Sequence, residues 1–110
     1  MSFQNENVIL IDLDNTLAIS DFNKEYSELN FDSQILDSIL LAKRKGYKVK
    51  IHTSRNMRSF NGDLKKIKNH TLPIIEDWLK KNNIPYDEII IGKPWCGPNG
   101  IYVDDKSLSP

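Results

Sequence analysis

The sequence is poor in cysteine and has no excess of charge of either sign. Its single cysteine, Cys96, excludes a disulfide within the chain and suits a reducing compartment. Lysine plus arginine and aspartate plus glutamate each number 15, so the formal net charge is zero. Because nucleic acids and anionic membrane surfaces are usually bound through a basic excess, we expect neither as a partner of this chain.

Long apolar runs are also missing. Every apolar run is far shorter than the roughly 20 residues that a helix needs to cross a bilayer. Residues 1–7 are polar and lack the basic and apolar parts of a signal peptide, so we expect a cytoplasmic protein. The 110 residues suffice for one compact core, and no repeat or linker divides them. We therefore expect a single domain over residues 1–110.

What the chain does have is a pair of acids directly behind a short apolar run. Residues 8–11 (Val-Ile-Leu-Ile) are too few and too β-branched for a helix and predict a buried strand. Asp12 and Asp14 follow it, separated by Leu13, and alternation along the turn lets both acids face one pocket. Two carboxylates at about 4 Å repel by about 4 kcal/mol at an effective dielectric near 20. The pair therefore predicts a bound cation, or chemistry, at the end of this strand.

Helical and strand patterns alternate along the rest of the chain. One helix is predicted from a cap at Asp32 or Ser33 to a stop at Gly46, and a second is predicted to open at Thr71 and Pro73. Strands are predicted at 47–53, 88–91 and 101–103. The connections are predicted to be a hairpin or irregular flap at 18–31 and a polar, basic loop at 54–70. This alternation predicts an α/β fold with a parallel sheet and right-handed crossovers.

Each predicted strand ends in polar residues of types that suit phosphate chemistry. In chain order these are Asp12 and Asp14, then Thr53, Ser54 and Arg55, then Lys93, and finally Asp104 and Asp105. Parallel strands share a direction, so the four ends are expected at one edge of the sheet, where ligands of open α/β folds bind.

Hydrolysis of a phosphate monoester needs a nucleophile, neutralised phosphoryl oxygens and a proton for the leaving group. Asp12, nearest the strand, is the predicted nucleophile, and Asp14 is the predicted acid and base. Mg²⁺ is the predicted cofactor because it binds one or two protein carboxylates and keeps several waters. Its predicted ligands are Asp12, the carbonyl of Asp14, and Asp104, with Asp105 close by or acting through water. The predicted phosphate contacts are a hydroxyl, an ammonium group and backbone amides, from Thr53, Lys93, Leu13, Asp14 and Ser54.

Two arginines behind the second strand leave two interpretations open. Arg55 and Arg58 either grip a substrate carboxylate or a second phosphate, or lie in a solvated loop and pair with neighbouring acids. His52 is expected opposite Thr53, packed or hydrogen-bonded. A zinc site is not expected, since two distant histidines and one cysteine lack ligand spacing.

The motifs and their order resemble the haloacid dehalogenase superfamily. That pattern is Asp-x-Asp-x-Thr, a Thr or Ser at the second strand end, a distal Lys and a late acidic pair, and all four occur here in order. More narrowly, residues 51–58, 69–73 and 85–96 look like the small capsule-biosynthesis phosphatases of that superfamily. The resemblance implies a Rossmann-like three-layer sandwich with a mostly parallel central sheet, Mg²⁺ dependence and an aspartyl-phosphate intermediate. The roles it implies fall on Asp12, Asp14, Thr53 (or Ser54), Lys93 and Asp104 (or Asp105).

The implied substrate is a small phosphate monoester of capsular polysaccharide biosynthesis: a phosphorylated sugar, polyol or amino alcohol, free or attached to a sugar acid. Superfamily members often carry a large cap domain, for which the gaps between the motifs here are too short. We therefore expect the site to be open, or roofed by residues 18–31, residues 54–70 or a neighbouring subunit, and we expect a homo-oligomer, a tetramer or a dimer. Two alternatives stay open: a phospho-accepting receiver-like domain, which keeps its phosphoryl group, and an inactive binding protein of the same fold.

Overall fold

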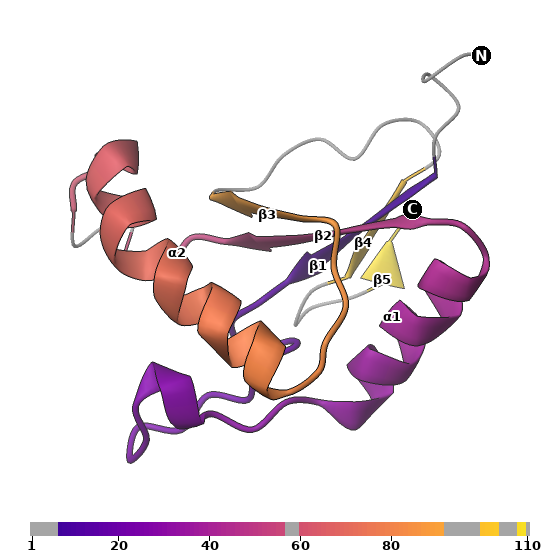
Figure 1. Ribbon diagram of the computed structural model, residues 1–110, viewed down its shortest axis with the longest axis horizontal. Helices are drawn as coiled ribbons and strands as arrows, with labels where there is room; N and C mark the ends of the chain where they lie inside the picture. Colours follow the sequence, from indigo (N-terminus) through magenta and orange to yellow (C-terminus); the bar gives the residue numbers. More distant parts are fainter. Residues whose placement is uncertain (1–6, 57–59, 92–99, 104–107, 110) are drawn as a thin grey trace.

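The computed structural model describes residues 7–56, 60–91, 100–103 and 108–109, and their centre is a five-stranded sheet (Figure 1). Its strands are β1 (Val8–Asp12), β2 (Lys48–Thr53), β3 (Glu88–Ile91), β4 (Ile101–Val103) and β5 (Leu108–Ser109), in the order β3-β2-β1-β4-β5. The first four pair in parallel, whereas β5 runs antiparallel to β4. The predicted α/β class with a mostly parallel sheet is confirmed. The two-residue strand β5 is an element that the sequence pattern does not predict.

The helices of the described chain, α1 (Ser33–Arg44) and α2 (Leu64–Lys81), lie on the same side of the sheet (Figure 1). Ile39 of α1 and Ile75 of α2 share one core with the strand residues Ile11 and Ile51. Because side chains alternate along a strand, Leu10, the neighbour of Ile11, points to the opposite face of the sheet, where a smaller apolar cluster forms. The third layer of the expected sandwich falls on the connection from β3 to β4, of which residues 92–99 lie outside the described part.

Helix α1 begins and ends where its sequence signals lie. The Asp32 carboxylate accepts hydrogen bonds from the backbone N–H groups of Gln34 (2.9 Å) and Ile35 (3.1 Å), which caps the first turn. Gly46 follows the helix with a φ of +87°, a conformation that other residues reach only with strain. Ile39 of this helix is buried, whereas its neighbour Leu40 is 43% exposed.

Helix α2 begins at Leu64, well before the predicted start at Thr71, so the expectation of a basic loop over residues 54–70 is wrong for its second half. The Asp63 carboxylate caps the helix, accepting from the N–H groups of Lys65 and Lys66. Pro73 lies inside the helix, where it removes one backbone hydrogen bond at a cost of about 3 kcal/mol relative to alanine. Full burial of Ile67 and Ile75 on the inner stripe contributes roughly 3–6 kcal/mol, which outweighs that cost.

The connection between β1 and α1 forms the flap (residues 18–31), and no large cap domain is inserted in the described chain. The base of the flap pairs as in a hairpin, through an antiparallel bridge between Ala18 and Phe31. Its outer part is irregular and contains the 3-10 turn η2 (Tyr26–Glu28), which lies beside α2 (Figure 1). The indole N–H of Trp78 in α2 donates to the carbonyl of Leu29 at 2.8 Å. The root of the flap is therefore attached to the helix layer.

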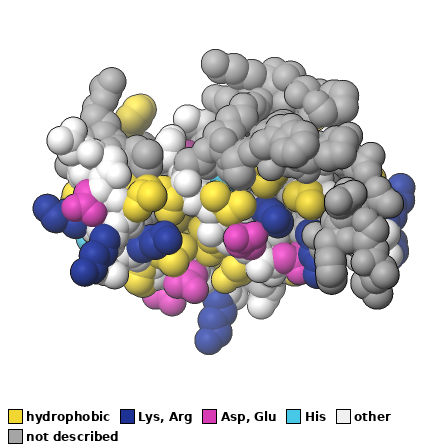
Figure 2. Space-filling model, turned by 90° about the horizontal axis from the view of Figure 1, so that it is seen from above, with side chains coloured by type: hydrophobic (Ala, Val, Ile, Leu, Met, Phe, Trp, Pro, Cys, Tyr) yellow, Lys and Arg dark blue, Asp and Glu magenta, His cyan; other side chains and the backbone are white. Residues whose placement is uncertain are grey.

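Within the described residues, neither helix combines the length and the apolarity that a membrane span requires. Figure 2 shows acidic and basic side chains interspersed with hydrophobic ones on the face seen from above. Positive and negative charges are therefore mixed on the visible part of this face, in keeping with the zero net charge of the chain.

Candidate active site

The turn behind β1 is folded tightly against the end of β2. The N–H of Leu13 donates to the carbonyl of His52 at 3.0 Å and so extends the parallel ladder past the last strand residue. The N–H of Ala18 then bonds back to the carbonyl of Leu13 at 2.8 Å, and Asn15 takes a left-handed φ of 64° that asparagine tolerates. Because the Leu13 side chain is buried in the core, the turn is fixed and Asp14 is held at its outer side.

The two oxygens of the Asp14 carboxylate are bound from the end of β2. The Thr53 hydroxyl donates to Oδ2 at 2.8 Å. The Arg55 guanidinium donates to Oδ1 through Nε (3.2 Å) and Nη2 (2.7 Å). The backbone N–H of Arg55 in turn donates to the Thr53 hydroxyl oxygen at 2.9 Å. The structure thus brings three of the predicted site residues into one hydrogen-bonded group.

Arg55 is a buried cation, which neither sequence interpretation anticipated in full. Its side chain is 5% exposed and that of its partner Asp14 is 31% exposed. The acid pairing matches one of the two open alternatives, but the solvated setting expected with it is wrong. The guanidinium carbon also lies 3.9 Å from the centroid of the Tyr26 ring, in a cation–π contact with the flap. Tyr26 carries no motif signal, and the aromatic character of the flap is the only hint of it in the sequence.

Asp12 lies on the other side of the sheet end. It is opposite His52 in the β1–β2 register, and its Oδ1 lies 3.8 Å from Nδ1 of that histidine. His52 and Thr53 are consecutive in β2, so strand alternation turns them to opposite faces, as predicted for this histidine. Asp12 and Asp14 are therefore anchored to side chains of opposite faces, while both remain partly exposed, at 24% and 31% of their side chains.

The remaining predicted site residues are placed as follows. Ser54 is exposed directly behind Thr53. The side chain of Leu13 is buried and its N–H already donates to the carbonyl of His52, so the prediction that this amide binds a phosphoryl oxygen is wrong. The other residues named from the sequence lie outside the described part of the chain: Lys93, Asp104, Asp105, Arg58 and Cys96.

The described part of the site offers hard oxygen donors. Asp12 supplies a partly exposed carboxylate and Asp14 a backbone carbonyl, which suits an ion that takes one or two protein carboxylates and retains water. The Asp14 carboxylate is already bound to Arg55 and Thr53, so it is not counted among the donors. Among the described residues, no three histidine, cysteine or acidic side chains gather as a ligand cluster. The fit to Mg²⁺ therefore rests on Asp12 and the turn.

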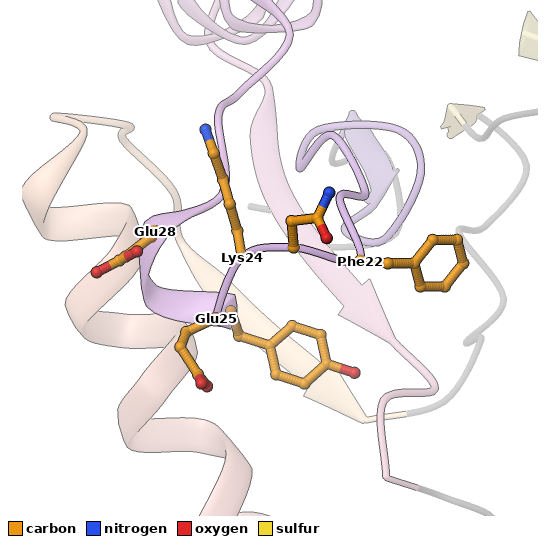
Figure 3. Close-up of a pocket in the computed structure, with 6 residues that line it drawn as sticks. Phe22, Lys24, Glu25 and Glu28 are labelled. Atoms are coloured by element: carbon orange, nitrogen blue, oxygen red, sulfur yellow. The ribbon is translucent and has the colours of Figure 1, made fainter.

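A pocket of about 280 Å³ opens in the flap next to this group (Figure 3). Its lining mixes aromatic, acidic and basic side chains: Phe22, Asn23, Lys24, Glu25, Tyr26 and Glu28. Tyr26 belongs both to this lining and to the contact with Arg55, so this residue links the pocket to the group around Asp14.

The mostly parallel sheet with its two helices places this protein in the α/β class, and acids and a buried arginine lie at the carboxyl edge of that sheet. Neither a family model nor a curated protein matches the chain. Among solved structures, a structural-genomics target from Vibrio cholerae is 39% identical, with a TM-score of 0.75, over 94% of this chain and 84% of the other. At this identity and coverage, the chain belongs to the same family as the Vibrio cholerae protein.

Two further structures share the fold at lower identity. One is a chain of the Pnkp1/Rnl/Hen1 complex, with 21% identity and a TM-score of 0.63 over 82% of this chain. The other is a chain of the Pnkp1/Rnl/Hen1 RNA repair complex, with 20% identity and a TM-score of 0.58 over 84% of this chain. This chain spans only 29% and 27% of those longer chains, so the likeness concerns one part of each and establishes the shared fold.

Proposed function

We propose that this protein is a Mg²⁺-dependent phosphomonoester hydrolase of the haloacid dehalogenase superfamily that works through an aspartyl-phosphate. One observation carries the proposal: Asp14, two residues beyond Asp12 at the end of β1, is bound by Thr53 and Arg55 from the end of β2. An acid, a hydroxyl and a cation thus meet at the sheet edge where α/β enzymes bind ligands. One of the two neighbours at lower identity belongs to an RNA repair complex, and RNA is a phosphate-linked polymer, which is in keeping with phosphoester chemistry on this fold.

In the proposed reaction, a carboxylate oxygen of Asp12 attacks the phosphorus atom and the bond to the leaving oxygen breaks. Asp14 donates a proton to that oxygen. A water molecule then attacks the aspartyl-phosphate, Asp14 takes its proton, and inorganic phosphate leaves with the Asp12 carboxylate restored. Asp12 and the carbonyl of Asp14 would hold Mg²⁺, which offsets the charge that gathers on the phosphoryl oxygens.

Thr53 has a particular part in this scheme. Its hydroxyl carries one proton, which it donates to Asp14 in the structure. When a phosphoryl oxygen accepts that proton instead, Asp14 loses one hydrogen bond and keeps those from Arg55. Substrate binding therefore frees Oδ2 of Asp14 from the Thr53 hydroxyl. An oxygen of Asp14 must be free in this way before Asp14 can act on the leaving group.

The flap pocket supports a small leaving group. Its volume of about 280 Å³ lies just below the range of about 300–1,000 Å³ for drug-sized ligands, which suits a small group. Its polar lining suits a hydroxylated or amino-bearing group, so we propose a phosphorylated sugar, polyol or amino alcohol, free or attached to a sugar acid, of capsular polysaccharide synthesis. A homo-oligomeric state, dimer or tetramer, and a cytoplasmic location stay predictions.

The test is phosphate release from a panel of sugar, polyol and amino-alcohol phosphates, with Mg²⁺ and with excess chelator. We expect turnover with Mg²⁺ and its loss with chelator. Asp12→Asn should lower kcat by roughly 10⁴-fold or more, as for removal of other enzyme nucleophiles, without change in the circular-dichroism spectrum. Asp37→Asn, on the exposed side of α1, is the matched control and should retain full activity.

Two results would contradict the proposal. Substantial activity of the Asp12→Asn variant would remove Asp12 as the nucleophile. Release of no more than one phosphate per chain across the panel would exclude a hydrolase and favour a receiver-like domain, or a binding protein if no phosphate is released.

A further inference from the structure

We infer that Tyr26, in the flap, is a positioning residue for the proposed reaction, because its ring holds Arg55 in the orientation that binds Asp14. The inference rests on the proposed phosphatase function and adds to it a role for a residue outside every sequence motif. Its basis is two successive contacts. The Tyr26 ring lies 3.9 Å from the guanidinium carbon of Arg55, and the guanidinium in turn binds the Asp14 carboxylate.

The geometry divides the guanidinium into a face and an edge. The Tyr26 ring covers the face, while Nε and Nη2 on the edge donate to Oδ1 of Asp14. A guanidinium is planar, so a contact on its face fixes the plane in which its N–H groups point. Without the ring, the group regains rotation about its terminal bonds, and the carboxylate loses a fixed direction.

The backbone of Tyr26 is itself held in place. Tyr26 begins the turn η2, and the carbonyls of two residues in or next to that turn accept hydrogen bonds from α2. These bonds are Trp78 Nε1 to Leu29 at 2.8 Å and Lys81 Nζ to Ser27 at 3.3 Å. The ring is therefore presented to Arg55 by an anchored turn and not by the tip of the flap.

Phe22 provides a matched comparison within the same pocket. It is an aromatic residue of the same flap, but its side chain is fully exposed, whereas Tyr26 is 48% exposed and contacts Arg55. Figure 3 shows Phe22 on the flap segment that also carries Lys24 and Glu25, the residues directly before Tyr26. A general effect of flap aromatics should appear at both positions, and a positioning effect only at Tyr26.

The experiment compares two ester classes that differ in their need for a proton donor. An alkyl phosphate needs protonation of its leaving oxygen, whereas the leaving group of p-nitrophenyl phosphate departs readily without it. A cation–π contact is worth about 0.5–2 kcal/mol, which corresponds to roughly 2- to 30-fold in rate. We expect Tyr26→Leu to lower kcat by that factor for the alkyl ester that the wild type hydrolyses fastest, and by much less for p-nitrophenyl phosphate.

Further variants separate positioning from a structural role. Tyr26→Phe keeps the ring and should stay within about twofold of the wild type. Phe22→Leu alters the pocket lining but not the contact with Arg55, so any loss it causes should be the same in the wild-type and Arg55→Met backgrounds. In an Arg55→Met background, Tyr26→Leu should have no added effect on the alkyl ester, because the residue through which it acts is gone. Circular dichroism and thermal unfolding check that each variant is folded.

An NMR measurement tests the contact without activity. The Arg55 Nε–H signal should exchange slowly in the wild type and in Tyr26→Phe, and faster in Tyr26→Leu. Equal losses for both esters, no loss, an additive loss in the Arg55→Met background or an unchanged Nε–H signal would overturn the inference while the phosphatase function stands. A wild type that hydrolyses neither ester would overturn the proposed function itself, and the positioning role with it.

Discussion

Replacement of Arg55 by methionine is the sharpest test of how the site is held together. Methionine keeps most of the apolar stem but removes the charge and all five N–H donors. Among side chains of the described residues, Asp14 would then retain the Thr53 hydroxyl as its one hydrogen-bond partner, and Tyr26 would lose the cation on its ring face. The change therefore probes one buried group that joins the ends of β1 and β2 to the flap.

The size of the effect follows from the burial of the two charges. A hydrogen bond to a charged group contributes about 1.5–3 kcal/mol, but the two N–H groups of Arg55 share one oxygen of a carboxylate that is 31% exposed. Water can therefore replace part of the loss, and we assign about 2 kcal/mol to the pair and about 0.5–1 kcal/mol to the ring contact. The expected loss in the free energy of unfolding is about 2–3 kcal/mol.

Urea unfolding at neutral pH, followed by circular dichroism, measures this loss. With a slope of about 1.5 kcal/mol per molar urea, the midpoint should fall by roughly 1.3–2 M with an unchanged slope. Arg44→Met, at an exposed position of α1, is the control and should lower the free energy of unfolding by less than about 0.5 kcal/mol. In an Asp14→Asn background the cost of Arg55→Met should be about halved. A shift no larger than that of the control would refute the view that Arg55 holds the site together.

Two further predictions concern stability away from the site. Burial opposes the charge of Asp87, but hydrogen bonds from the Val49 N–H and the Lys43 ammonium outweigh it and lower the pKa of this carboxyl below its ordinary value. A lowered pKa contributes stability that is present above the ordinary value near 4 and is lost as the pH falls through the folded one. Asp87→Asn should therefore lower the free energy of unfolding by about 1 kcal/mol at pH 7. Unfolding curves at pH 5, 4 and 3 should show the difference between the wild type and this variant shrinking, and a constant difference would contradict this account. Pro73→Ala on the exposed side of α2 should raise the free energy of unfolding by about 1–3 kcal/mol and increase the helical circular-dichroism signal, and a loss of stability would show that the proline fits its helix without strain.

The strands and the first helix were predictable because their signals are local. The apolar run at β1 and the Asp32 cap with the Gly46 stop each act within a few residues, so the sequence carries the whole cause. The start of α2 was missed because two signals compete. Pro73 favours a first helical turn in isolation, whereas the cap at Asp63 and the burial of Ile67 extend the helix seven residues further back.

The meeting of Asp14 with Thr53 was predictable from the sequence, but the meeting of Asp14 with Arg55 was not. Motif order places Asp14 and Thr53 at neighbouring strand ends, where the structure finds them hydrogen-bonded. Arg55 meets Asp14 across 41 positions of the chain, and it stacks on an aromatic residue of an irregular flap. No periodicity or spacing encodes that meeting, since it depends on how the flap folds back over the strand ends.

The attachment of the flap at its root has a consequence for how this scaffold can diversify. Ala18 forms a β-bridge with Phe31, and the indole N–H of Trp78 donates to the carbonyl of Leu29. The stretch between Ala18 and Leu29 is therefore attached at both of its ends. Residues of this stretch other than Tyr26 can therefore vary without a change in any residue of the sheet edge. The segment proposed to contact the leaving group can diversify in this way while Asp12 and Asp14 stay in place.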